Sequence, residues 1–219
     1  MDALAIIGTA GRGKDASRIN RELYDAMYKL AVETAREWGE TSLVSGGAAV
    51  ADHLAVRAFN EGVADKLTLF LPAEFKDGFF VPDNAIQFNP GATLIRYHGA
   101  FSMDCGIDSL EEIAQAIEKG ADVIVKPGFH NRNIEVAAAR SMIAMTFTPA
   151  GRSGRGELVE TFTPNDEGFS SSKDAGLRDG GTAHTWGECW NAQRKRHVNL
   201  ARLEADLRAK PSGMPNFGF

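Results

Sequence analysis

The sequence predicts an α/β fold, a three-layer sandwich with a mainly parallel sheet, and three observations support that prediction. Short apolar runs that end in glycine, LAIIG at 4–8 and TSLVSGG at 41–47, are typical of strands that are buried on both faces. Segments with the periodicity of amphipathic helices follow these runs. The connections between strand and helix are short, which is characteristic of a parallel sheet covered by helices.

The N-terminal third of the chain contains the clearest elements. Apolar residues at three- and four-residue spacing predict a helix over about 18–38, which Gly39 ends. A second helix is predicted over 50–62, and KLTLFLP at 66–72 has the composition of a third strand. Three strands alternating with two helices form a βαβαβ unit with right-handed crossovers, the building block of a Rossmann-like fold.

The segments between 92 and 125 are harder to assign. ATLIRYHG at 92–99 is compatible with a strand. Ser109 and Glu112 have the spacing of a capping box, which predicts a helix over about 109–119. ADVIV at 121–125 is either a strand or an irregular approach to the next segment.

The C-terminal part returns to alternating elements. We expect a helix over 131–141, a buried strand over 142–147, a helix over about 182–195, a strand over 196–200 and a terminal helix over 201–210. About thirty polar, glycine-rich residues separate the buried strand from the helix that follows it. The chain is therefore predicted to be one Rossmann-like domain over 1–205 with an inserted loop at about 148–179, and a C-terminal tail over 206–219.

Composition restricts which binding partners and which cellular compartment we expect. The formal net charge of -5 over 219 residues disfavours a broad basic surface, so nucleic acid is not an expected partner. The two cysteines and five histidines show no metal-ligand spacing, and no metal or cofactor is expected. The N-terminus lacks the features of a signal peptide, and no apolar run approaches the roughly 20 residues that a bilayer needs. We expect a cytoplasmic protein with free thiols and no membrane partner.

Ligands of open α/β sheets bind beyond the carboxyl ends of the strands, where glycines and helix N-termini expose backbone amides. Four segments of this kind contain the residues that we expect to bind a ligand. These are Gly8, Thr9, Gly11 and Arg12 after the first strand; Ser45, Gly46, Gly47 and Asp52 after the second; Arg132 and Asn133 at a helix start; and Gly180, Gly181, Thr182 and Thr185 after the long loop. Such a set suits a ligand that carries phosphate.

Several of these residues also have a purely structural interpretation. Arg12 can be a solvated surface charge, and Asp52 a favourable partner of a helix dipole. Arg132 and Asn133 can be a surface arginine beside an ordinary helix cap. Trp186, just inside the last segment, either stacks on a base or packs in the core. The residue pattern leaves these alternatives open.

The segments AIIGTAGRG, SLVSGGAAVADHLA, LFLPAEF, NRN, MIAMTF and GGTAHTW, in this order, resemble the SLOG superfamily of Rossmann-like proteins. That superfamily includes DprA-like proteins, LONELY GUY-type phosphoribohydrolases and sensor domains for NAD-derived signals. The resemblance covers most of residues 3–200. SGGAAVAD is similar to the family pattern Ser-Gly-Gly-Ala-x-Gly-x-Asp, with Val50 where glycine is usual. It implies that Asp52 faces the ligand and that the protein forms a homodimer, with the tail or residues 73–120 at the interface.

Among these relatives, the phosphoribohydrolases cleave the N-glycosidic bond of nucleoside 5′-monophosphates with an arginine of an Arg-Lys pair and a glutamate of the motif PGGxGTxxE. Arg132 is similar in placement to that arginine, and Asn133 stands where the lysine is usual. Thr185 and Glu188 resemble the TxxE end of the motif, with no proline before the glycines and one extra residue between glycine and threonine. The resemblance implies catalytic roles for Arg132 and Glu188.

Three functions are therefore considered. The first is binding of a nucleotide or nucleotide-derived molecule, a nucleoside phosphate or an NAD-like compound, with hydrolysis of its N-glycosidic bond. The second is a non-catalytic sensor or sequestering protein for a nucleotide signal. The third, single-stranded DNA binding, is the weakest because of the acidic composition. We expect the loop at 148–179 to act as a lid or add substrate contacts, unless it is only a surface excursion.

Overall fold

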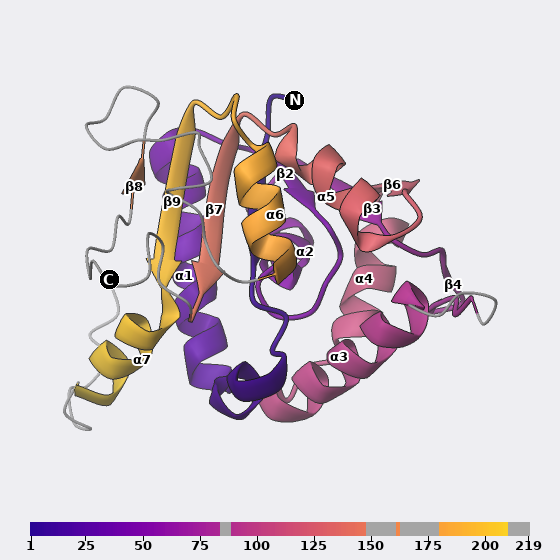
Figure 1. Ribbon diagram of the computed structural model, residues 1–219, viewed down its shortest axis with the longest axis horizontal. Helices are drawn as coiled ribbons and strands as arrows, with labels where there is room; N and C mark the ends of the chain where they lie inside the picture. Colours follow the sequence, from indigo (N-terminus) through magenta and orange to yellow (C-terminus); the bar gives the residue numbers. More distant parts are fainter. Residues whose placement is uncertain (84–88, 148–160, 163–179, 210–219) are drawn as a thin grey trace.

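The computed structural model describes residues 1–83, 89–147, 161–162 and 180–209, and it contains a sheet between two layers of helices (Figure 1). The strand order of the main sheet is β6-β3-β2-β1-β7-β9-β8. All neighbouring pairs are parallel except β8 and β9, which are antiparallel. The predicted α/β sandwich with a mainly parallel sheet is confirmed.

The elements have the following bounds. The strands of the main sheet are β1 (Leu4–Gly8), β2 (Ser42–Ser45), β3 (Lys66–Leu71), β6 (Asp122–Val125), β7 (Ser141–Thr146), β8 (Thr161–Phe162) and β9 (Arg194–Asn199), and a separate hairpin contains β4 (Phe75–Lys76) and β5 (Phe79–Phe80). The helices are α1 (Arg21–Trp38), α2 (His53–Asn60), α3 (Pro90–Cys105), α4 (Ser109–Glu118), α5 (Phe129–Ala137), α6 (Gly180–Glu188) and α7 (Leu200–Ala209), with a 3-10 helix η1 (Gly13–Arg18) before α1.

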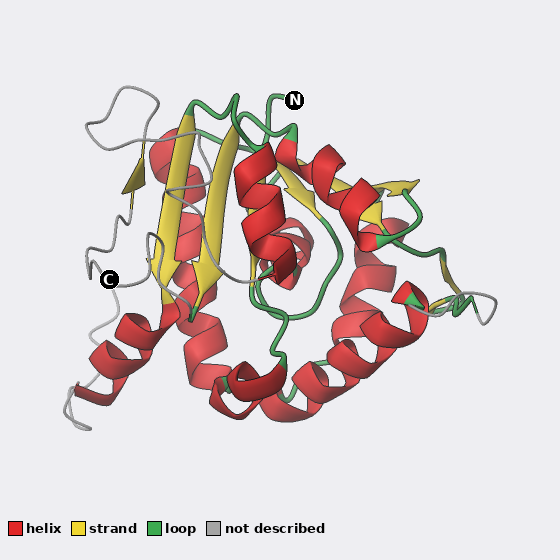
Figure 2. Ribbon diagram, in the orientation of Figure 1, coloured by secondary structure: helices red, strands yellow, loops and turns green. Residues whose placement is uncertain are grey.

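The two faces of the sheet have separate cores. Leu4 and Ile6 of β1 pack in a cluster with residues of α1, α2, α3, α4 and α7. Ala5 and Ile7, which point the other way because side chains alternate along a strand, pack with residues of α5 and α6. Figure 2 shows α5 and α6 on one side of the strands and α1 and α2 on the other.

The order in which strands are added to the sheet reverses next to β1. The chain builds β1, β2, β3 and β6 outward on one side, and then crosses over through α5 to β7, which pairs with β1 on the other side. Gly8 at the end of β1 lies opposite Met145, and a Cβ on Gly8 would overlap the Met145 carbonyl oxygen. The close approach of β1 and β7 therefore requires glycine here. This reversal is a topological switch point, where α/β sheets bind ligands.

One predicted alternative is wrong. The segment 92–99 is not a strand but part of helix α3. The Asn89 side chain accepts a hydrogen bond from the Ala92 amide, and Pro90 occupies the first turn, where its missing N–H costs nothing. The buried residues of the helix recur at helical spacing: Leu94, His98, Phe101 and Cys105.

Other boundaries shift. Asp108 rather than Ser109 caps α4, since its carboxylate accepts from the Glu111 amide, and Ser109 is buried instead. The 121–125 segment is a strand. Helix α6 ends at Glu188 and β9 begins at Arg194, so the helix expected to reach 195 is shorter.

The expected domain end at 205 falls inside α7. The expected loop at 148–179, apart from β8, and the part of the tail beyond 209 lie outside the described residues. Both cysteines are free and buried. Within the described ranges, no helix combines the length and apolar character needed to traverse a bilayer.

Candidate functional site

A cavity of about 440 Å³ lies at the switch point, beyond the carboxyl end of β1. Five segments form its wall: the end of β1, the loop after β2, and residues of α3, α5 and α6. Eight of the residues predicted from sequence line it, namely Gly8, Arg12, Asp52, Arg132, Asn133, Gly181, Thr182 and Thr185. We call it the switch-point cavity.

A buried ion pair forms part of this wall. Arg132 Nη1 lies 3.2 Å from Asp52 Oδ2, although the two residues are 80 positions apart in the chain. Burial raises the pKa of the Asp52 carboxyl and lowers that of the Arg132 guanidinium, and each opposes the shift of the other. Arg132 Nε has no hydrogen-bond partner among the described residues, so one buried donor is still unsatisfied. Arg132 is thus no surface arginine.

The loop after β2 shapes the pair. Asp52 occupies the N-cap position of α2 but makes no cap bond, and its carboxylate accepts from the Ala48 amide at 3.4 Å. The Ser45 hydroxyl holds the loop, because it donates to the Asp52 carbonyl and accepts from the Gly47 amide. Asp52 therefore serves the cavity wall rather than the helix terminus.

Two features of this loop are conformationally demanding. Val50, which stands where the related pattern has glycine, has φ of 64°, a left-handed conformation that is unusual for a β-branched residue. Gly47 has φ of 65° and its carbonyl accepts from a ring nitrogen of His98. Glycine adopts a positive φ freely, so the strain lies at Val50. Such strain persists only where the surrounding structure enforces it, and it is concentrated at functional sites.

The start of α6 closes the cavity on the other side. The Thr182 hydroxyl donates to the Gly8 carbonyl at 2.7 Å, and the Asn133 side-chain amide donates to the Gly181 carbonyl at 3.2 Å. The Thr185 hydroxyl also donates to Gly181. These bonds tie β1, α5 and α6 together and place Gly181 and Thr182, in the first turn of α6, at the cavity wall. The first amides of a helix have no intrahelical acceptor and are suited to bind an anion.

Other predicted residues support the site without lining it. Thr9 donates to Asp15 and accepts from the Gly11 amide, which fixes the turn that presents Arg12. Gly46 lies beneath the Arg132 guanidinium. Ser45 and Gly47 hold the loop as described, and Gly180 opens α6.

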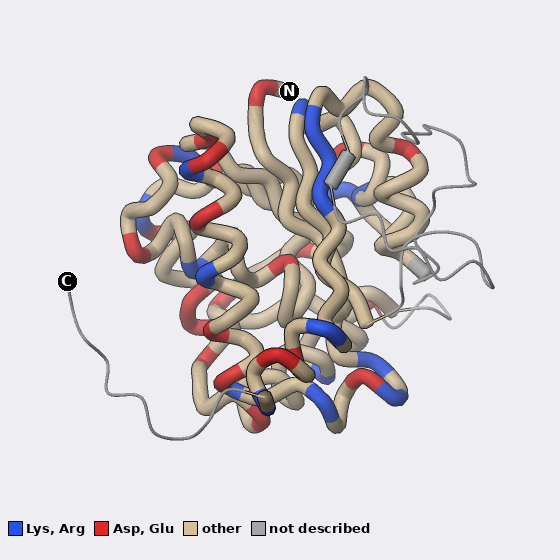
Figure 3. Tube along the Cα trace, turned by 90° about the vertical axis from the view of Figure 1, so that its left-hand side faces the viewer, with Lys and Arg blue, Asp and Glu red and all other residues tan. Residues whose placement is uncertain are grey.

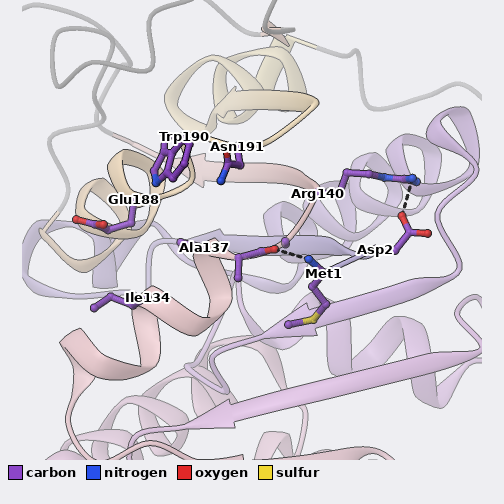
Figure 4. Close-up of a pocket in the computed structure, with 10 residues that line it drawn as sticks. Met1, Asp2, Ile134, Ala137, Arg140, Glu188, Trp190 and Asn191 are labelled. Carbon is purple, nitrogen blue, oxygen red and sulfur yellow. Dashed lines mark hydrogen bonds and ion pairs between the residues drawn. The ribbon is translucent and has the colours of Figure 1, made fainter.

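Glu188 is separated from the rest of the predicted site. It lines a different cavity, of about 530 Å³, with Met1, Ile134 and Trp190, and Figure 4 shows it beside Trp190. The reason is the direction of α6, which starts at the switch-point cavity and runs away from it. Glu188 lies six positions after Thr182, which corresponds to about 9 Å along a helix axis. Trp186 is buried against the core and does not line the switch-point cavity.

The sequence analysis missed the aromatic part of the wall. Tyr97 of α3 and Phe129 of α5 both line the switch-point cavity. Phe129 directly precedes the HNRN segment, so its position next to a predicted site was visible in the sequence. The position of Tyr97 in the cavity wall could not be predicted, because a strand over 92–99 does not indicate which other segment Tyr97 faces.

Fold and cavity together define a Rossmann-like α/β protein with a ligand-sized cavity at its switch point. No family model matches the chain, and no solved structure matches it. It is 35% identical over 161 residues to "Uncharacterized protein R261" of Acanthamoeba polyphaga mimivirus, a match that covers 69% of this chain and 85% of the viral protein. The chain therefore belongs to the same family as that mimiviral protein.

Proposed function

We propose that this protein binds a nucleotide or a nucleotide-derived small molecule in the switch-point cavity. The observation that carries the proposal is that Arg12, Arg132 and the start of α6 meet around Asp52 in one cavity. Guanidinium groups and helix N-termini are suited to phosphate, and carboxylates are suited to ribose hydroxyls. The resemblance to the SLOG superfamily supports the same class of ligand.

The lining residues suggest how the ligand is oriented. Its phosphate contacts the amides at the start of α6 and the exposed Arg12, and its ribose lies near Asp52 and Asn133. Tyr97 and Phe129 offer aromatic surface to the base. Each part of a nucleotide thus has a chemically matched part of the wall.

Binding without turnover is the form of this proposal that the geometry favours. The glutamate implied as catalytic, Glu188, lines another cavity. Asp52 is the carboxylate that lines the switch-point cavity within the described residues, and it is already ion-paired with Arg132. Hydrolysis of an N-glycosidic bond would therefore depend on Asp52 as the acid or base.

Isothermal titration calorimetry with nucleoside mono-, di- and triphosphates, NAD and ADP-ribose tests the binding proposal. We expect saturable binding of at least one of these ligands, and Arg12→Ala should weaken it about tenfold or more, because a charge-assisted hydrogen bond contributes roughly 1.5–3 kcal/mol. Lys14→Ala is the matched control, since Lys14 is also exposed and does not line the cavity. Absence of binding across the series would refute the proposal.

Chromatography of the same incubations distinguishes a sensor from a hydrolase. A binding protein leaves the ligand intact, whereas a hydrolase releases free base. If base appears and Asp52→Asn abolishes its release, the hydrolytic alternative is correct.

Single-stranded DNA binding has less support. Figure 3 shows Lys and Arg interspersed with Asp and Glu along the outer helices. Single-stranded nucleic acid is held mainly by basic surface, which the formal net charge of -5 does not favour.

A further inference from the structure

The edge strand β6 is unusually apolar and exposed. Val123, Ile124 and Val125 retain 37%, 40% and 42% of their accessible surface. Strands of a parallel sheet are normally covered on both faces, and exposed apolar edges are templates for pairing with another strand. β6 is the last strand of the sheet on this side, next to β3 (Figure 1).

The free hydrogen-bonding groups of this edge can be identified. The Lys126 amide donates to the Leu71 carbonyl at 2.8 Å, so residue 126 directs its backbone groups toward β3. Since the direction alternates along a strand, Ile124 also faces β3, while Val123 and Val125 direct their N–H and C=O groups away from the sheet.

The sequence of the edge is self-complementary. Residues 122–126 read Asp-Val-Ile-Val-Lys. In an antiparallel pair of two such strands centred on Ile124, each aspartate lies opposite a lysine and each Val123 opposite a Val125. The outward N–H and C=O groups of Val123 then meet those of Val125, which is the arrangement of a hydrogen-bonded antiparallel pair.

The charges favour a second copy over a foreign strand. Asp122 is exposed and has no partner within the part of the chain that the structure describes. Lys126 makes an ion pair of 2.6 Å with Glu135 but remains partly exposed, with 38% of its side-chain surface accessible. In the antiparallel pair, Asp122, Ile124 and Lys126 occupy non-hydrogen-bonded positions, where facing side chains approach most closely.

We propose that β6 pairs antiparallel with β6 of a second copy and forms a symmetric homodimer with a continuous sheet. The contact is isologous, so it closes at two copies. It differs from the interface at residues 73–120 or the tail that the family resemblance implied, and it is independent of the proposed function. A pair of five-residue strands is small beside the roughly 1,200–2,000 Å² of a standard interface, so the dimer should be weak and concentration-dependent.

Sedimentation equilibrium over a concentration series, with the full chain, tests this arrangement. Val123→Pro removes an outward N–H without removing a bond to β3, and it should abolish self-association. Asp122→Lys and Lys126→Asp each place two like charges opposite each other at both ends of the pair, and each should weaken the dimer about tenfold.

Charge reversal gives a sharper test. The double variant Asp122→Lys/Lys126→Asp should recover wild-type self-association, and a mixture of the two single variants should form a heterodimer more tightly than either forms a homodimer. Circular dichroism and thermal unfolding of each variant monitor folding, because Lys126→Asp also replaces the Lys126–Glu135 ion pair with two like charges. A wild-type monomer at every concentration, or a dimer that Val123→Pro and the charge variants leave unchanged, overturns the proposal.

Discussion

The guanidinium of Arg132 packs directly against the Gly46 backbone, so close that a Cβ at position 46 would overlap Nη1 and Cζ. Because Gly46, directly after β2, has no side chain, there is room for the guanidinium of Arg132 from helix α5. The ion pair between Arg132 and Asp52 depends on this approach.

Gly46→Ala is expected to displace Arg132. The overlap involves a buried guanidinium that has little room to move, so we expect destabilisation of about 1–3 kcal/mol and loss of nucleotide binding. Gly99→Ala is the matched control: Gly99 lies inside α3 with nothing within 4 Å of an added Cβ, and the substitution should be neutral or stabilising by up to about 1 kcal/mol. Urea unfolding measures both, and equal effects of the two variants would contradict the assignment.

Removing one member of the buried pair should be worse than removing both. Arg132→Ala leaves the Asp52 carboxylate buried without its cation, and we expect it to lower stability by about 3–5 kcal/mol. The double variant Asp52→Leu/Arg132→Met should recover most of that loss but not ligand binding. If the double variant binds as the wild type does, the pair has only a structural role.

Glu188→Gln should leave nucleotide binding unchanged and alter stability by less than about 0.5 kcal/mol, because the half-exposed Glu188 side chain lies outside the switch-point cavity. Titration calorimetry and thermal unfolding check both expectations. If Glu188→Gln loses ligand affinity, or if the wild type releases free base and Glu188→Gln does not, Glu188 has the role implied by the family resemblance.

Acid should destabilise the protein through His98. Burial lowers the pKa of this histidine from 6.5 to about 4, and its ring is bonded to Ser109 and the Gly47 carbonyl. The unfolded chain binds a proton below pH 6.5 that the folded chain refuses until about pH 4, so stability is full above 6.5 and falls as the pH drops through this window.

The free energy of unfolding should consequently be about 2 kcal/mol lower at pH 5 than at pH 7 from His98 alone. Burial of His53, with a pKa lowered to about 3, adds in the same direction. His98→Gln should be less stable at pH 7 but show a shallower pH dependence than the wild type, and an unchanged slope would contradict this account. Urea titrations at pH 5, 6 and 7 decide between these outcomes.

Much of the fold was predictable because short apolar runs and helix-ending glycines mark strands and helices locally in the sequence. The apolar runs at 4–8 and 142–147 became the adjacent strands β1 and β7, and Gly39 ends α1 in a left-handed conformation as expected. Segment 92–99 failed because a short apolar run with one histidine fits either element, and the cap at Asn89 that decides for a helix lies upstream of it. The end of α6 was placed too late because Gly187 lies inside the helix and neither glycine nor proline stands between Glu188 and β9.

The sequence by itself determined the alternation of elements, the glycine turns at the strand ends and eight of the residues that line the switch-point cavity, because backbone conformation and burial periodicity are properties of contiguous residues. Only the tertiary structure decided that Arg132 is buried against Asp52, that Tyr97 and Phe129 share their cavity, and that Glu188 does not. Those relationships join residues far apart in the chain. They depend on which way each helix runs from the switch point, where the strand order reverses between β1 and β7.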